Sequence, residues 1–87
     1  MTQEEIRKQV HQFIRKNFLF DDKAALGDDQ SLLGSGVVDS TGILELISFL
    51  EETCRVKFAD SELVADNFDT INRIADFIAA KLNREKV

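Results

Sequence analysis

The sequence predicts an all-α protein: a small helical bundle with three main helices, a short helix before the last, and a long first loop. The 87-residue chain has no proline and only four glycines, so helices can run with few interruptions. Apolar residues recur at helical spacing in three stretches, and none shows sustained alternation with a period of two. A chain of this length buries one small core, so residues 1–87 are expected to form a single domain.

The first helix is expected from about Gln3 to Phe18. Thr2 followed by Glu5 forms a capping-box pattern that marks its beginning. His11 lies off the apolar stripe, so it is expected to be exposed. The stripe, which is mainly apolar, consists of Ile6, Val10, Phe13, Ile14 and Asn17.

Between residues 19 and 38 the helical periodicity is lost, and the segment is predicted to be a loop. Asp21, Asp22, Asp28 and Asp29 do not have the spacing of a calcium loop and are interpreted as turn residues. Several apolar residues are scattered among them, so the loop is expected to be pinned across the core. These residues are Leu26, Leu32, Leu33, Val37 and Val38.

The second helix is expected to begin after Asp39, which as N-cap would accept a hydrogen bond from the N–H of Thr41 or Gly42. Val38 and Ile43 have the spacing of a hydrophobic staple. The predicted buried stripe is Ile43, Leu46, Ile47, Leu50 and Cys54. The predicted solvent face is Thr41, Glu45, Ser48 and Glu52, with Leu44 and Glu51 at its margin.

A short helical turn is expected around residues 60–63, followed by a last helix capped by Thr70 or Asp69. The apolar stripe of that helix is Ile71, Ile74, Ala75, Ile78 and Leu82, with Phe77 on its flank. Across the three main helices, the residues expected to be largely buried are Ile6, Phe13, Ile14, Ile43, Leu46, Ile47, Leu50, Ile71, Ile74 and Ile78.

Charge and composition restrict the class of function. The formal net charge of −5 disfavours binding to nucleic acid or an anionic membrane surface and favours partners with basic patches. The single cysteine, Cys54, excludes an internal disulfide or a multi-cysteine metal site and is expected in the core. The polar start and the absence of an apolar run of about 20 residues predict a cytoplasmic protein without membrane insertion. We expect a monomer without a metal site.

Ser40 is the candidate functional residue. It follows Asp39 at the predicted loop-to-helix junction, where a phosphate attached to its hydroxyl would lie at the positive end of the helix. The sequence has no paired catalytic constellation, so we expect a protein that is modified at Ser40 and is not itself an enzyme. The structural alternative is an ordinary serine in the first turn of a helix.

The segment from Gly36 to Leu46, GVVDSTGILEL, resembles the acyl and peptidyl carrier protein family. Leu50-Glu51-Glu52, Val56-Lys57-Phe58 and Asn67–Ile71 extend the resemblance over nearly the whole chain. The resemblance implies an acyl-carrier-like helical bundle and a single phosphopantetheine-binding carrier domain over residues 1–87. It also implies that 4′-phosphopantetheine is attached covalently to Ser40, beside Asp39, and holds cargo as a thioester.

Within the family, Gly42 and Thr41 replace an acid and an apolar residue that are usual in fatty-acid carriers. Glycine at the first position is similar to the D-alanine carriers of teichoic acid modification, and Asp39 stands where peptide-synthetase carriers typically have histidine. The resemblance therefore implies a free-standing carrier with an acyl or aminoacyl cargo. Gly42 itself has two interpretations: a tolerated helix glycine, or one that clears space beside the arm or a partner.

The implied partners are a phosphopantetheinyl transferase and either an adenylating acyl or amino-acid ligase or an acyltransferase. The alternative function is an all-α adaptor that binds a basic partner through its acidic second helix and carries no prosthetic group. Only the carrier requires an exposed, chemically competent Ser40 hydroxyl. The expected partner face is Thr41, Leu44, Glu45, Ser48, Glu51 and Glu52.

Overall fold

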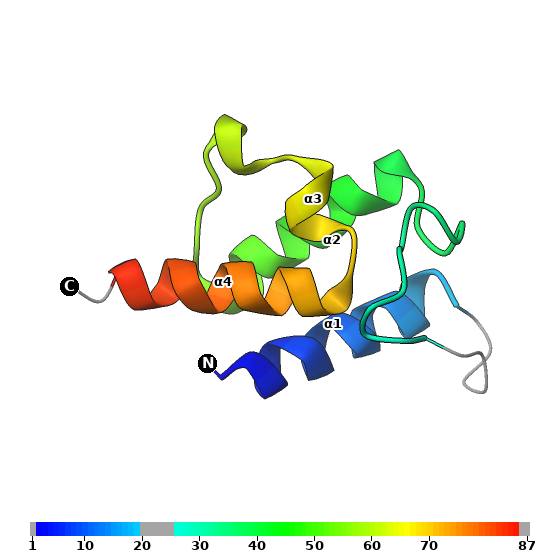
Figure 1. Cartoon of the computed structure of the whole chain (residues 1–87), viewed down its shortest axis with the longest axis horizontal. Helices are drawn as coiled ribbons and strands as arrows, with labels where there is room; N and C mark the ends of the chain where they lie inside the picture. The colour runs from blue at the N-terminus through cyan, green and yellow to red at the C-terminus, as the bar shows by residue number, and fades with distance from the viewer. Residues whose placement is uncertain (1, 20–25, 86–87) are drawn as a thin grey trace.

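The protein is all-helical, as predicted (Figure 1). The computed structural model describes residues 2–19 and 26–85, and no strand occurs in these two ranges. The elements in chain order are α1 (Gln3–Asn17), α2 (Ser40–Cys54), the 3-10 helix η1 (Asp60–Glu62), α3 (Ala65–Phe68) and α4 (Ile71–Glu85). Thr2 and Glu5 form the predicted capping box at the start of α1.

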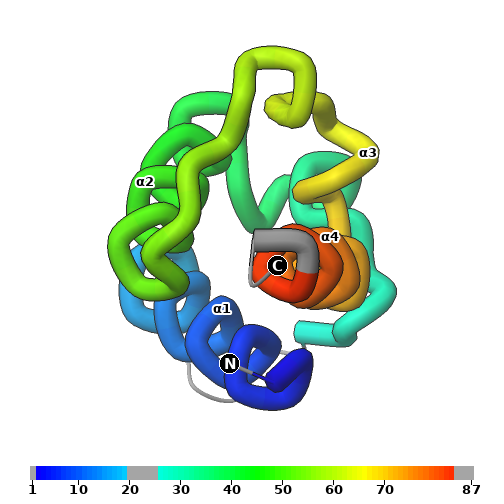
Figure 2. The backbone as a smooth tube through the Cα atoms, turned by 90° about the vertical axis from the view of Figure 1, so that its left-hand side faces the viewer, coloured from blue at the N-terminus to red at the C-terminus, as the bar shows by residue number. Residues whose placement is uncertain are grey.

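Three long helices enclose one interior. α1 packs against both α4 and α2, and the short α3 packs on α4. Figure 2 shows α1, α2 and α4 arranged around this interior, with η1 and α3 on the remaining side. The fully buried helical core comprises Ile6, Val10, Ile14, Leu46, Leu50, Ile71, Ile74, Ala75 and Ile78.

Two residues of the predicted core, Phe13 and Ile43, are only half-buried. Phe13 stacks on Phe49 at the seam between α1 and α2, with ring centroids 4.4 Å apart. Asn17 completes the sequence stripe of α1 but is exposed, and its side chain donates to the carbonyl of Phe13 at 2.9 Å. The α1 stripe therefore turns out of the interior before the helix ends.

The described part of the first loop is pinned to the core. Leu26, Leu32 and Val38 are buried, whereas Leu33 is 37% exposed. The N–H of Leu32 donates to the carbonyl of Asp69 at 2.7 Å, which fastens the loop to the chain just before α4. The predicted turn residues Asp21 and Asp22 lie outside the described residues.

The prediction that His11 is simply exposed is wrong. His11 is half-buried, and its Nε2 lies 2.6 Å from Oδ1 of Asp28 in the first loop. Asn72 in α4 accepts from Arg7 Nε at 2.9 Å and donates to Asp29 Oδ1 at 2.6 Å. The two aspartates are thus more than turn residues, because they belong to a polar network that joins α1, the loop and α4.

The segment between α2 and α4 contains two short helices where the sequence predicted one. The expected turn is η1, whereas α3 was not anticipated as a separate element. Thr70 caps α4, because its Oγ1 accepts from the N–H of Arg73 at 3.0 Å. Cys54 is buried as expected, and its burial raises the pKa of the thiol.

Candidate functional site

The candidate site lies where the first loop enters α2. Asp39 has extended backbone torsions and is the N-cap of the helix. Its carboxylate accepts from the N–H of Gly42 at 2.6 Å, and its carbonyl accepts from the N–H of Ile43 at 2.9 Å. This confirms the predicted cap and makes Ser40 the first residue of α2.

Ser40 is exposed, and its hydroxyl has no hydrogen-bond partner among the described residues. The backbone N–H groups of Ser40 and Thr41 also have no acceptor in the described part of the chain. The first turn of a helix always leaves donors without an intrahelical partner, and they lie at the positive end of the helix dipole. An accessible hydroxyl therefore stands beside donors that suit a phosphate group.

Gly42 makes room for core side chains in the first turn of α2. It is buried, and a Cβ at this position would lie 2.8 Å from Phe18 Cε1 and 2.8 Å from Val38 Cγ1. Such contacts are too short for carbon atoms, so an alanine would force the neighbours to move. Of the two interpretations of Gly42, clearing space for the arm or a partner is wrong, because the space is occupied by Phe18 and Val38.

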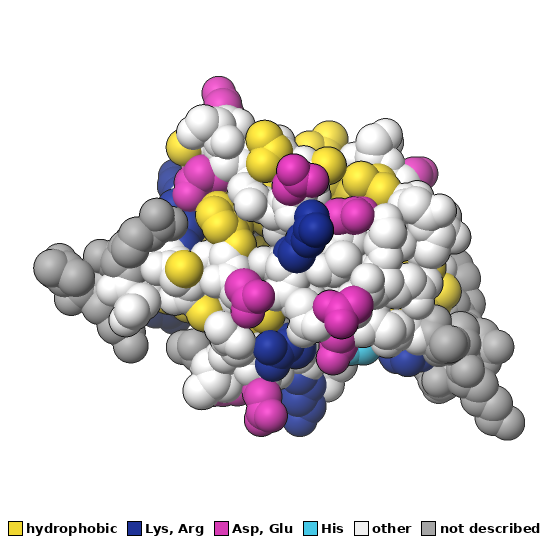
Figure 3. Space-filling view, in the orientation of Figure 1, with side chains coloured by type: hydrophobic (Ala, Val, Ile, Leu, Met, Phe, Trp, Pro, Cys, Tyr) yellow, Lys and Arg dark blue, Asp and Glu magenta, His cyan; other side chains and the backbone are white. Residues whose placement is uncertain are grey.

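An apolar groove begins at Ser40. The large hydrophobic side chains that are exposed in the described residues are Leu33, Leu44, Leu63 and Val64, at 37–62% exposure. All four line one groove of about 160 Å³ together with Ser40. Figure 3 shows hydrophobic side chains along this side of the molecule, over the η1–α3 segment. Ile43, Ile47, Ala65 and Phe68 complete the lining.

Most of the predicted partner face is accessible. Leu44, its large hydrophobic residue, is 62% exposed. Glu51 is less accessible, because it is half-buried and its Oε2 accepts from the N–H of Phe58 at 3.2 Å. Glu51 therefore helps to hold the chain after α2 in place. The exposed members of the predicted face are Thr41, Leu44, Glu45, Ser48 and Glu52.

The sequence did not single out Leu33, Leu63 or Val64 as parts of the site. They lie in the first loop and just before α3, where apolar residues have no periodicity that reveals their direction. The one available signal in the sequence was that these apolar residues lie in segments without a helical apolar stripe, so no helix face is predicted to bury them. Only the fold shows that these segments meet at the start of α2.

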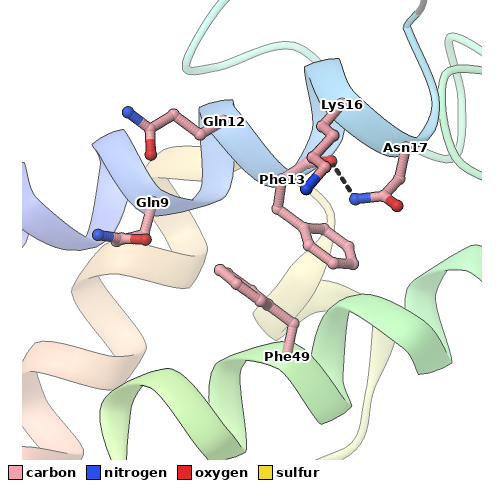
Figure 4. A pocket seen from close by; sticks show the side chains of 6 residues that line it. All are labelled: Gln9, Gln12, Phe13, Lys16, Asn17 and Phe49. Carbon is pink, nitrogen blue, oxygen red and sulfur yellow. Dashed lines mark hydrogen bonds between the residues drawn. The ribbon is translucent and has the colours of Figure 1, made fainter.

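A second hollow lies at the seam between α1 and α2, away from Ser40 (Figure 4). The facing rings of Phe13 and Phe49 form its floor, and its other lining residues are Gln9, Gln12, Lys16 and Asn17.

In the described parts of the chain, no group of acidic, histidine or cysteine side chains is arranged to hold a metal ion. Among the same residues, no helix has the length and apolar character needed to cross a membrane.

No protein-family model matches the sequence. The chain is similar to the D-alanyl carrier proteins of Streptococcus pyogenes serotypes M5 (strain Manfredo), M49 (strain NZ131) and M1. Each is 41% identical over 46 residues, which is 53% of this chain and 58% of the relative. The chain thus spans somewhat more than half the length of the curated relatives it matches. Together with the all-helical fold and the motif around Ser40, this similarity supports placing the chain in a carrier protein family.

Proposed function

We propose that this protein is a free-standing carrier with 4′-phosphopantetheine attached to Ser40, which delivers an acyl or aminoacyl group between partner enzymes. The observation that carries the proposal is the unpartnered, exposed Ser40 hydroxyl at the first residue of α2. The similarity to D-alanyl carrier proteins supports it independently.

The residues around Ser40 fit such a group. A phosphodiester on Ser40 Oγ would place its negative charge beside the N–H groups of Ser40 and Thr41. Asp39 keeps Ser40 in the first helical turn through its bond to Gly42, and its own exposed carboxylate is available to help position a metal ion of the transferase. The attached group supplies a terminal thiol on a flexible arm, which holds cargo as a thioester.

The partners supply the catalysis in this proposal. A phosphopantetheinyl transferase modifies Ser40, and an adenylating acyl or amino-acid ligase, or an acyltransferase, loads the cargo. Docking of a partner turns each later reaction of the tethered cargo into a nearly intramolecular one. The partner face comprises Thr41, Leu44, Glu45, Ser48 and Glu52, together with the groove beside Ser40.

The decisive experiment is intact-mass analysis after incubation with coenzyme A and a broad-specificity phosphopantetheinyl transferase. Wild type and Ser61→Ala, which removes an exposed serine of η1 outside the partner face, are expected to gain the mass of one phosphopantetheine group. Ser40→Ala is expected to fold normally, because an exposed hydroxyl contributes little to stability, and to gain no mass. A mass gain in Ser40→Ala would refute the attachment site, and no gain in wild type would favour the adaptor.

The cargo is proposed to be an amino acid or a short acyl group. The name of the relatives, D-alanyl carrier protein, supports an aminoacyl cargo, and so do Thr41 and Gly42 in the motif. Competitive loading of the modified protein by fatty-acid enzymes and by amino-acid ligases tests this. Efficient elongation of a long acyl chain without aminoacyl loading would overturn the cargo while leaving the carrier function intact.

A further inference from the structure

One wall of the groove beside Ser40 is built from a segment with little regular structure. Leu63 and Val64 lie between the three-residue η1 and the four-residue α3, and they are 39% and 47% exposed. Helices this short gain little stability from their own hydrogen bonds. The position of this wall relative to α2 therefore depends on what fastens the segment to the long helices.

Glu62 and Lys81 provide that fastening. Lys81 Nζ in α4 lies 3.0 Å from Oε1 and 3.3 Å from Oε2 of Glu62, the residue just before Leu63. The side chains of Lys81 and Glu62 are only 12% and 20% exposed. An ion pair that is largely withdrawn from water is screened less by salt than a surface pair, and removing one partner is correspondingly costly.

Glu62 also accepts hydrogen bonds from residues on both sides of Leu63 and Val64. Its Oε1 also accepts from the N–H of Ala59 at 2.8 Å, and its carbonyl accepts from Nδ2 of Asn67 in α3 at 2.9 Å. One residue therefore connects both ends of the wall segment to α4.

Lys81 is held from a second direction by an aromatic cluster. Its Nζ lies 5.9 Å from the ring centroid of Phe58. That ring packs on Phe68 and Phe77, with centroids 5.3 and 5.7 Å away. Phe68 also lines the groove, so the cluster links the Lys81 site to the groove beside Ser40.

A second ion pair, between α4 and the neighbouring short helix α3, provides a natural comparison. Arg73 Nη1 of α4 lies 3.6 Å from Asp66 Oδ1 of α3, but these side chains are 56% and 93% exposed. Exposed pairs of this kind contribute little to stability. The anchoring role therefore falls on Lys81.

We propose that Glu62 and Lys81 are positioning residues of the carrier: their ion pair holds the Leu63–Val64 wall at the spacing from α2 that a partner enzyme meets when it reaches Ser40. Neither residue lines the groove, so both act through the wall segment. The inference rests on the proposed carrier function. It adds two residues outside the groove, Glu62 and Lys81, that affect how a partner docks.

The test compares wild type with Lys81→Met, the charge swap Glu62→Lys/Lys81→Glu, and Arg73→Met as a matched control. The first readout is amide hydrogen exchange at Leu63, Val64 and Asn67, whose N–H groups make the local bonds of the wall segment. The second is the KM and kcat of Ser40 modification by a phosphopantetheinyl transferase with coenzyme A. Glu62→Gln, which keeps an acceptor for Ala59 and Lys81, replaces Lys81→Met if that variant does not fold.

Lys81→Met is expected to speed exchange in the wall segment about tenfold, without affecting α1, and to raise the transferase KM about fivefold with little change in kcat. The charge swap should recover only part of both effects, because a lysine at position 62 cannot accept from the N–H of Ala59, and Arg73→Met should leave both near wild type. Unchanged KM in Lys81→Met, even with faster exchange, or equal effects in Arg73→Met, would overturn the inference. If wild type is not modified at all, the carrier function itself fails, which is a distinguishable result.

Discussion

Gly42 shows how the absence of one side chain shapes the surroundings of Ser40. It lies two residues after Ser40 in the first turn of α2, and the ring of Phe18 occupies the place that a Cβ would need. The close approach fixes the start of α2 against the end of α1. The direction in which the Ser40 side chain points thus depends on the contact that Gly42 makes in the same helical turn.

Gly42→Ala is therefore expected to destabilise the protein, although alanine is the better helix former. The gain in helix propensity of about 1 kcal/mol should be exceeded by overpacking against Phe18 and Val38, for a net loss of up to about 2 kcal/mol. Urea unfolding followed by circular dichroism measures the difference. Ser48→Ala in the same helix is the control, because Ser48 is exposed and its replacement should be neutral or stabilising. A Gly42→Ala protein more stable than wild type would contradict the packing argument.

At the level of the helix, α2 presents two different surfaces beside Ser40. Glu45 and Glu52 are exposed carboxylates, whereas Leu44 lines the apolar groove. Charges at the rim of a transient interface act mainly on the association rate, while apolar contacts at its centre act on the lifetime of the complex. The two surfaces should thus affect docking in separable ways.

Reversing both charges, as Glu45→Lys/Glu52→Lys, is expected to slow transferase modification of Ser40 severalfold at low salt. The deficit should shrink as ionic strength rises, because salt screens exposed charges. Leu44→Ser, the matched change on the apolar surface, should produce a deficit that salt does not relieve. Stopped-flow or initial-rate measurements across a salt series distinguish the two. Wild-type modification that is insensitive to salt would count against the acidic surface.

The three long helices could be predicted because each has 15 residues, enough for an apolar stripe to repeat several times. Their caps, Thr2, Asp39 and Thr70, could be predicted from local sequence alone. α3 could not be predicted, since four residues are too few for an apolar stripe to repeat. The groove could not either, because Leu33 and Val64 meet only through the tertiary fold.

At the scale of the whole molecule, the polar network around Asn72 joins three parts of the chain that are distant in sequence. It connects Arg7 of α1, Asp29 of the first loop and α4, and His11–Asp28 lies alongside it. No sequence pattern identifies such partners, because each bond depends on packing that other residues create. The first loop is therefore fixed by polar bonds on this side and by Leu26 and Leu32 in the core.

Asn72→Ala is expected to lower the free energy of unfolding by about 1–3 kcal/mol, because it removes one bond to a guanidinium and one to a carboxylate. Asn17→Ala removes only a local bond to the Phe13 carbonyl at an exposed position, so it should change stability by less than about 0.5 kcal/mol. Chemical denaturation of both variants gives the comparison. Equal stabilities for the two variants would show that the network does not hold the loop.

The contact between Phe18 and Gly42 has a consequence for how this protein could be re-engineered. The chain leaves α1 at Phe18 and, after the whole first loop, returns to the same point at the start of α2. The two ends of the first loop are thus held together independently of its length. Doubling the length of a flexible loop costs only about 0.6 kcal/mol in closure entropy. A longer first loop should therefore leave the geometry at Ser40 unchanged, so the loop could carry a tag or fused peptide.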